Sequence, residues 1–341
     1  MTRFSPIRVK IARHRRRLSM DELVKRMGES AVSKMTISKI ERGLLTPSAK
    51  TLEAIAAACD VPASFFSAPE ISLSPMCFRY AKDIPSKRAK QIEAEVTLKI
   101  EDCFAKEQLI AGATAFTNPL QGLVIRTYAD AEEAARQLRQ HIVLGTHPIH
   151  SVYEMLQEMG VMVVEVDVPS LQLLGTSTVI NGVQPVVIVN THSCTTTERK
   201  RFTALHELAH LILTIQPIAE EDFHNERSDV TLKCPTVERL CHHFASAMLI
   251  SPSSIKRRLG DWRTALSLRE LISLRCMYGI SIAAAVHRAH DLAIIPDTTY
   301  NRLYDKHINK NNMEDGWGEY PIMEKADRCE LLEERMMTGD L

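Results

Sequence analysis

Two histidines and a glutamate within five residues are the part of the sequence best suited to metal chemistry. His206, Glu207 and His210 lie in the segment 202–213 (FTALHELAHLIL), which is otherwise mostly apolar. On a helix, residues four apart share a face, so both imidazoles can reach one tetrahedral zinc ion at about 2.0–2.1 Å. Glu207 can take a proton from a water molecule whose pKa the metal lowers to about 7. Histidines that are merely hydrogen-bonded in a core are the alternative, and unsatisfied polar groups on such a helix would be costly.

A catalytic zinc site needs a third protein ligand from elsewhere in the fold. Glu238 is the best candidate, because it opens a well-formed predicted helix at 237–249. Glu238 and His242 are four apart and share a face, so one can ligate while the other orients a ligand histidine from outside. The residues alone leave rivals for the third position, namely His224, Glu226, Asp229, His242 and His243.

The elements around this segment predict a mixed α and β region. Helices are expected at 129–144 and 151–159, and strands at 161–168, 176–179 and 186–189. The last two strands flank Asn181-Gly182, which predicts a hairpin. Thr195 and Glu198 predict a capping box for the metal-site helix, which should run to about Ile215 before Pro217. The chain after 249 is mainly helical to Ile295.

The first 68 residues predict short helices carrying a strong positive charge. Helices are expected at 7–17, 19–28, 33–42 and 48–59. Residues 1–50 hold thirteen Lys and Arg but four Asp and Glu, a net charge of +9, whereas the whole chain has a formal net charge of zero. A basic head on an acidic body indicates a polyanionic partner for the head alone.

Between these regions the sequence predicts a connection and one long helix. Residues 69–90 contain three prolines and little periodicity, so they are interpreted as a linker. Ile92, Val96, Ile100 and Cys103 follow at helical spacing. This helix would pair with a second copy, bridge domains, or pack on its own domain. The expected division is 1–68, 69–126, 127–256 and 257–341, where the last part is a helical C-terminal region.

Composition excludes several classes of protein. The chain of 341 residues is 45% hydrophobic and 25% charged, as in globular proteins. No apolar run approaches the roughly 20 residues of a membrane span, and the first residues lack the apolar stretch of a signal peptide. The eight cysteines form no C-x-x-C pair. We therefore expect reduced cysteines in a soluble cytoplasmic protein with no membrane partner.

Two sequence blocks resemble the ImmA/IrrE family of metallopeptidases. They are RFTALHELAH at 201–210 and ERLCHHFASAMLISP at 238–252, with weaker similarity at 268–295 and 316–321. The resemblance implies a small zincin-like domain with a short sheet, so that the expected class is α+β and mostly helical. It also implies that His206, His210 and Glu238 bind Zn²⁺, with Mn²⁺ as the alternative, and that Glu207 is the general base.

The resemblance has departures at the metal site. The family has an Ala-Asn or Ala-Asp pair where this chain has Cys241-His242. His242 would therefore be a partner of a ligand or an alternate ligand. Leu205 and Ala209 replace the alanine and glycine of the family's first block, and Pro252 comes one residue later than usual.

The N-terminal region resembles XRE-type helix-turn-helix regulators, with SKMTISKIERG at 33–43 in the position of the recognition helix. Met20 stands where the family has Gln, and the turn at 28–33 is longer than usual. The resemblance implies that the domain binds a double-stranded DNA operator. The base-facing residues carried over are Lys34, Met35, Thr36 and Lys39, and the expected phosphate contacts are Arg13, Arg15, Arg16, Arg17 and Arg42.

Together these features predict a DNA-binding transcriptional regulator with a zinc metalloendopeptidase domain. Its expected substrate is a regulatory protein such as a repressor or antitoxin, in a stress-response, mobile-element or toxin–antitoxin system, and its expected assembly is a homodimer. The strands at 176–190 would hold the substrate by β-addition. The alternative is a transcription factor or antitoxin without proteolysis, whose zincin-like domain senses a ligand or a partner such as a toxin.

Overall fold

The computed structural model describes residues 4–68, 70–76, 84–108, 115–223 and 233–326. The chain divides into two compact units. Unit 1 comprises Met1–Ser74, Arg79–Leu109 and Ile180–Gly182, and unit 2 comprises Pro75–Phe78, Ile110–Val179 and Val183–Leu341. The predicted α+β, mostly helical class is confirmed. Among the described residues, no helix has both the length and the apolar character needed to cross a membrane.

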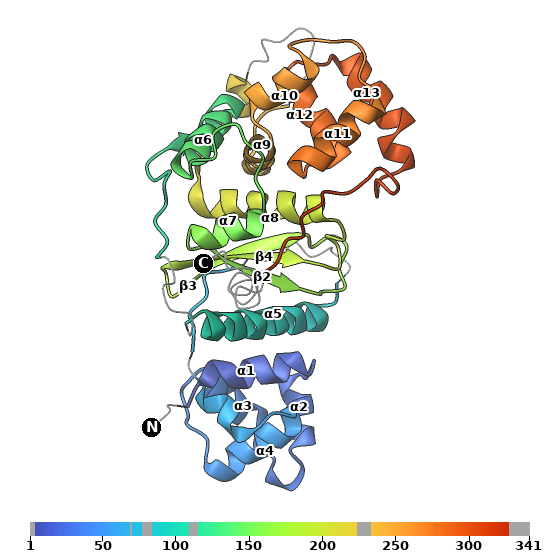
Figure 1. Cartoon of the computed structure of the whole chain (residues 1–341). Coiled ribbons are helices and arrows are strands. Elements are labelled where there is room, and N and C mark those ends of the chain that lie inside the picture. Colours follow the sequence, from blue (N-terminus) through green and yellow to red (C-terminus); the bar gives the residue numbers. More distant parts are fainter. Residues whose placement is uncertain (1–3, 69, 77–83, 109–114, 224–232, 327–341) are drawn as a thin grey trace, which may run out of the picture. The chain divides into compact units, whose positions relative to one another are not determined.

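Unit 1 is built from five helices (Figure 1): α1 (Pro6–Arg15), α2 (Met20–Arg26), α3 (Lys34–Glu41), α4 (Ala49–Cys59) and α5 (Ser86–Glu107). Ser19, Ser33 and Ser48 cap α2, α3 and α4, because each hydroxyl accepts a hydrogen bond from the backbone N–H three residues later. The first four helices enclose an apolar core that includes Val9, Leu23, Ile37, Ile55 and Phe66. The helical N-terminal region predicted from the sequence is thereby confirmed.

Helix α5 packs against α1 within unit 1. Arg8 of α1 donates to Glu101 of α5 at 2.7 Å, and both side chains are nearly buried. Of the three arrangements predicted for this helix, the structure therefore shows the packing of α5 on its own unit. Pairing of α5 with a second copy stays a prediction.

The sheet of unit 2 has three strands in the order β2-β4-β3: β2 (Met162–Val166), β4 (Gln184–Asn190) and β3 (Gly175–Ile180). Strands β2 and β4 are parallel, with Met162 opposite Val186 and Val166 opposite Asn190. Asn181 and Gly182 connect β3 to β4 with positive φ angles of 52° and 73°, as expected for a tight hairpin turn. A second, two-stranded sheet joins β1 (Val124–Ile125) in parallel to β5 (Thr214–Ile215).

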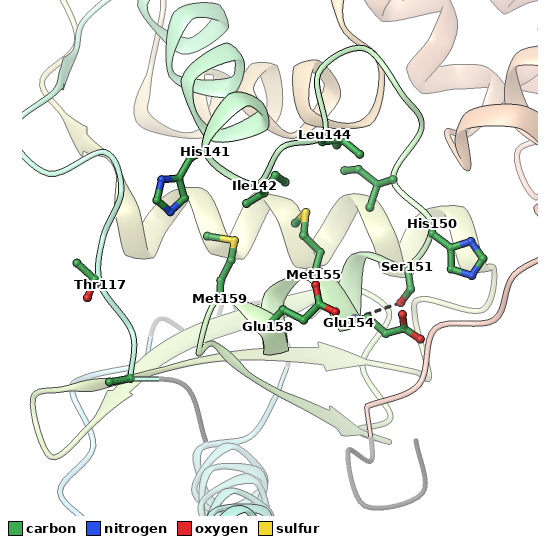
Figure 2. A pocket seen from close by; sticks show the side chains of 12 residues that line it. Thr117, His141, Ile142, Leu144, His150, Ser151, Glu154, Met155, Glu158 and Met159 are labelled. Carbon is green, nitrogen blue, oxygen red and sulfur yellow. Dashed lines mark hydrogen bonds between the residues drawn. The ribbon is translucent and has the colours of Figure 1, made fainter. Parts of the chain in front are cut away.

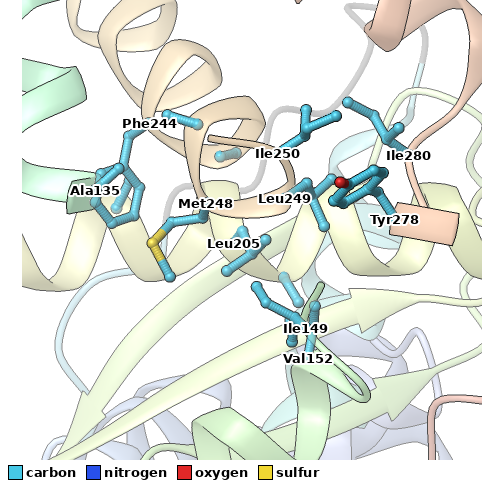
Figure 3. Close-up of a cluster of buried hydrophobic side chains, with 14 of the residues drawn as sticks. Ala135, Ile149, Val152, Leu205, Phe244, Met248, Leu249, Ile250, Tyr278 and Ile280 are labelled. Atoms are coloured by element: carbon cyan, nitrogen blue, oxygen red, sulfur yellow. The ribbon is translucent and has the colours of Figure 1, made fainter. Parts of the chain in front are cut away.

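The helices of unit 2 cover this sheet in layers. Helices α7 and α8 lie along the sheet and separate it from the other helices (Figure 1). Apolar side chains from α7, α8 and α9 meet in one core, where Val152, Leu205, Phe244 and Met248 are completely buried (Figure 3). The helices are α6 (Tyr128–His141), α7 (Val152–Glu158), α8 (Thr197–Ile212), α9 (Val237–Leu249), α10 (Pro252–Leu259), α11 (Leu268–Tyr278), α12 (Ile282–Asp291) and α13 (Asp297–Lys306).

Helix α8 differs from its predicted bounds at both ends. The cap is Thr196, whose hydroxyl accepts from the backbone N–H of Arg199, so the predicted box with Thr195 is wrong. Glu198 does not reach back to the cap because Arg275 binds both of its carboxylate oxygens in the interior. The helix ends at Ile212 rather than near Ile215, since the next residues pair with β1 as strand β5.

Candidate metal centre

Helix α8 brings the two motif histidines together on one face. The Nε2 atoms of His206 and His210 are 3.1 Å apart, and the two rings meet edge to face. The opposite side of α8 holds Leu205, Leu208 and Ala209, all completely buried. This apolar side fixes the rotation of the helix, so both imidazoles lie on the face toward α9.

Helix α9 supplies a carboxylate to the same point. Glu238 lies in its first turn, two residues after the cap residue Thr236. Its two oxygens lie 3.3 Å from Nε2 of His206 and 3.5 Å from Nε2 of His210. Helices α8 and α9 pack directly on each other, which holds the carboxylate opposite the histidines.

The spacing of these three donors fits a divalent metal ion. Ligand bonds of about 2.05 Å at tetrahedral angles put neighbouring donor atoms about 3.3 Å apart. The two Nε2 atoms are 3.1 Å apart, and each histidine meets a different oxygen of Glu238, at 3.3 Å for His206 and 3.5 Å for His210, so each pair is close to that value. Two imidazole nitrogens and one carboxylate are also a donor set that catalytic zinc sites use. Within the described ranges, His206, His210 and Glu238 form the one group of this kind.

Glu207 lies beside the donors and is held from strand β3. Its side chain is nearly buried, and the hydroxyl of Ser177 donates to its Oε2 at 3.0 Å. Gly175 makes this approach of β3 to α8 sterically feasible. A Cβ at that position would lie 2.6 Å from Cγ2 of Thr203 and 3.2 Å from Cγ of Glu207.

His242 and Cys241 contact the two histidines from outside the donor group. The ring of His242 stacks on that of His206, with centroids 4.4 Å apart and planes tilted by 32°. The Sγ of Cys241 lies 3.6 Å from Nδ1 of His210. His242 therefore has the position of a partner to a ligand, whereas the role of alternate ligand stays a prediction.

His243, the other rival ligand that the structure describes, binds a different group. Nε2 of His243 is 2.7 Å from a carboxylate oxygen of Glu132 on α6, and the same carboxylate accepts two hydrogen bonds from Arg288 on α12. His224, Glu226 and Asp229 lie outside the described residues.

Sequence reasoning missed the buried ion pairs that hold α8 from behind. Arg201 and Glu324 form a completely buried pair at 2.6 Å. Glu324 also accepts from the backbone N–H groups of Val152 and Tyr153, so it caps α7. Gly279 has a φ of +59°, and a Cβ there would lie 2.4 Å from Nε of Arg201. The sequence carries little signal for this pair, because Arg201 follows Glu198, Arg199 and Lys200 in the charged first turns of α8.

A separate cavity of about 540 Å³ lies beside α6 and α7 (Figure 2). Its lining includes His141, Glu154, Met155 and Glu158, and it contains none of the three metal donors. It offers no counterpart of the convergent donors at α8 and α9. The candidate metal centre is therefore the stronger functional site.

The predicted DNA contacts lie in unit 1, around α3. Met35 is 67% exposed, and Lys34 is exposed at the first turn, where it pairs with Asp21 at 2.7 Å. Thr36 donates its backbone N–H to the cap Ser33, and its hydroxyl lies 2.9 Å from that of Ser33. The first turn of α3 thus presents three of the four predicted base-facing residues, and Lys39 follows in the last turn.

The predicted phosphate contacts divide into exposed and buried side chains. Arg13 is buried, because it donates to both oxygens of Glu41 and to the backbone oxygen of Leu18. A guanidinium held in this way does not suit the predicted phosphate contact. The others are more exposed, although Arg17 donates to Gln91, Arg42 donates to the backbone oxygen of Ser38, and Arg16 lies 3.7 Å from Asp60; Arg15 is also exposed.

Comparison with known families agrees with the division of the chain into unit 1 and unit 2. Residues 9–66 match the family model described as helix-turn-helix, and residues 156–290 match that of the IrrE N-terminal-like domain. The second range contains His206, Glu207, His210 and Glu238. No curated protein and no solved structure matches the chain. The chain is thus a fusion of an XRE-type helix-turn-helix domain with an ImmA/IrrE-type metallopeptidase-family domain.

Proposed function

We propose that this protein binds an operator in double-stranded DNA through α3 and cleaves a regulatory protein at a zinc centre in unit 2. The observation that carries the proposal is the convergence of His206, His210 and Glu238, whose side chains approach one another to 3.1–3.5 Å beside Glu207. The proposed substrate is a repressor or antitoxin, and the proposed assembly on DNA is a homodimer. Manganese is the alternative metal.

Zinc held by these three side chains would supply a Lewis acid that polarises the scissile carbonyl and activates water. Glu207 takes a proton from the attacking water and delivers it to the nitrogen of the leaving amine as the C–N bond breaks. Ser177 orients Glu207 through its hydrogen bond to Oε2. The other carboxylate oxygen is then the proton acceptor.

The substrate would lie against strand β3. This strand is at the edge of the sheet order β2-β4-β3, where Leu73 bridges its last residue, Ile180, and its Ser177 already contacts the general base. An extended peptide that adds to an edge strand gains backbone hydrogen bonds whatever its sequence. Its scissile bond would then lie beside Glu207.

The test compares the wild type with Glu207→Gln at equal, measured metal content. The substrates offered are helix-turn-helix repressors and antitoxins encoded beside the gene. We expect the variant to lose at least about 100-fold in cleavage rate, as general acid–base catalysis contributes this much, and to bind the operator as the wild type does. Glu133→Gln, on α6 with a side chain that is 42% exposed, is the matched control and should cleave normally.

The alternative function predicts a different result. A regulator without proteolysis would cleave none of these proteins in either form. Glu207→Gln would then give the same promoter response as the wild type, and the proposal of a peptidase would be rejected.

A further inference from the structure

A cavity of about 580 Å³ lies beside the candidate metal centre and contains none of its three donors. Its walls come from α6, α8, α9, α12 and α13 of unit 2. Its volume is in the range of pockets that bind small ligands or several side chains. Neither the proposed reaction nor the family comparisons assign it a role.

The ring of His242 lies between this cavity and the metal donor His206. His242 lines the cavity, and the same ring stacks on His206 at 4.4 Å. Arg239 also lines it and directly follows Glu238 on α9. A peptide held at the metal would therefore present a side chain near its scissile bond to this cavity.

Among the described residues that line the cavity, the one carboxylate is that of Asp291, and histidines compensate it. Its oxygens lie 3.6 Å from Nδ1 of His243 and 3.9 Å from Nδ1 of His290. Burial alone would lower the pKa of both histidines, but hydrogen bonds to carboxylates outweigh burial and raise both pKa values. The carboxylates behind the lining also have basic partners, because Glu132 pairs with Arg288 and Asp297 pairs with His290.

Two further cations face the cavity, namely Lys233 and Arg239. Within the described ranges no carboxylate pairs with either of them, and Arg239 donates to the backbone oxygen of Cys234. The described lining residues therefore carry a net positive charge. Tyr300 adds a flat ring that contacts His290 at 4.5 Å and His287 at 5.2 Å between centroids, so the wall is aromatic as well as cationic.

We propose that this cavity is the subsite for an acidic side chain, Asp or Glu, near the scissile bond of the substrate. The proposal rests on the proposed peptidase function and names the substrate class of that site. Arg239 and Lys233 attract the carboxylate, and the imidazole rings supply N–H donors for it. A lysine at the same substrate position is repelled.

The test measures peptide binding without turnover. Metal-loaded, full-length Glu207→Gln is titrated with fluorescent peptides from the substrate region, each with Glu, Gln or Lys at one position flanking the scissile bond. We expect Glu to bind at least about tenfold more tightly than Gln at one of these positions. In Glu207→Gln combined with Arg239→Glu, the preference should shift to Lys, at unchanged metal content.

The matched control is Arg199→Glu, which makes the same charge change at an exposed position of α8 outside the cavity. It should keep the preference for Glu. Equal binding of the Glu and Gln peptides, or an equal effect of Arg199→Glu, overturns the proposal. The proposal is also overturned if glutarate binds with micromolar affinity and displaces the peptide, because the cavity would then be a site for small organic acids.

Cleavage by the wild type separates this proposal from the peptidase function. Peptides that are cleaved with no acidic preference reject the subsite and leave the peptidase standing. Peptides that bind with an acidic preference and are never cleaved reject the peptidase and leave an anion-binding cavity.

Discussion

At the scale of single residues, the candidate centre depends on contacts that fix the orientation of each donor. His210 directs Nε2 toward the other donors, so its Nδ1 carries the proton when a metal is bound. That N–H faces the Sγ of Cys241 at 3.6 Å. Metal-binding histidines usually donate to a carboxylate or a carbonyl oxygen, which are stronger acceptors than a thiol. The thiol therefore orients His210, but as a weaker acceptor than the usual oxygen.

The first prediction concerns Cys241. Cys241→Ala removes the acceptor, and we expect about tenfold weaker zinc binding, as for other partners of metal ligands. Affinity is measured by competition with a chromophoric chelator. Cys194→Ala, at a second completely buried cysteine of unit 2, is the control and should bind zinc normally. Equal affinities in all three proteins would show that the thiol has no orienting role.

The second prediction concerns Gly175. In Gly175→Ala the new methyl group would lie 2.7 Å from the backbone oxygen of Ile188 as well as against Thr203. Overpacking of this kind costs about 1–3 kcal/mol, so we expect unit 2 to unfold at lower urea concentration. Both tryptophans, Trp262 and Trp317, belong to unit 2, so their fluorescence reports its unfolding. An unchanged midpoint would mean that β3 can move away from α8.

At the scale of elements, α9 is held on the opposite side from Glu238 by a buried charged cluster. Burial alone would raise the pKa of Glu132, but hydrogen bonds from Arg288 and His243 lower it to about 2. Arg288 is itself completely buried. This cluster joins α6, α9 and α12, and so it contributes to the position of Glu238 over α8.

The third prediction is that Glu132→Gln strongly destabilises unit 2. Removing one partner of a buried ion pair costs about 3–5 kcal/mol, because Arg288 keeps its charge without a counterion. The native pKa of Glu132 is depressed, so its contribution is present above the unfolded value of about 4.5 and is lost as the pH falls toward 2. As the pH falls from about 4.5 to about 2, the free energy of unfolding should therefore decrease less in the variant than in the wild type. Glu133→Gln, at the exposed neighbour, should resemble the wild type in urea unfolding at each pH.

How far the sequence predicts these elements depends on how local their interactions are. The spacing of His206 and His210 lies within one helix, so the pair could be predicted directly. Glu238 needed the family resemblance, because packing of α9 on α8 is not encoded in spacing. The capping error at Thr195 has the same origin, since Arg275 binds Glu198 from 77 residues away. The burial of Arg13 against Glu41 was likewise invisible in the charge pattern.

At the scale of the whole molecule, the two proposed activities rest on separate units. The core of unit 1 lies within residues 9–66, whereas the three metal donors belong to α8 and α9 in unit 2. The two proposed activities also differ in chemistry, because the proposed operator contacts include lysine and arginine side chains and no metal ligand. Neutralising phosphates makes operator binding depend on salt, with a slope near 0.9 per phosphate contact.

The fourth prediction follows from this separation. Removing the metal with a chelator should abolish cleavage and leave the dissociation constant for the operator unchanged within about twofold. Both are measured on the same full-length sample, by gel analysis of the substrate and by fluorescence anisotropy of the operator, before and after zinc is restored. Metal removal also takes away a ligand that stabilises the folded state of unit 2, so the tryptophan unfolding midpoint should fall. A loss of operator affinity that zinc restores would instead mean that unit 2 controls unit 1. That result favours a metal-dependent sensor, because a ligand alters DNA binding only if it distinguishes two states of the whole chain.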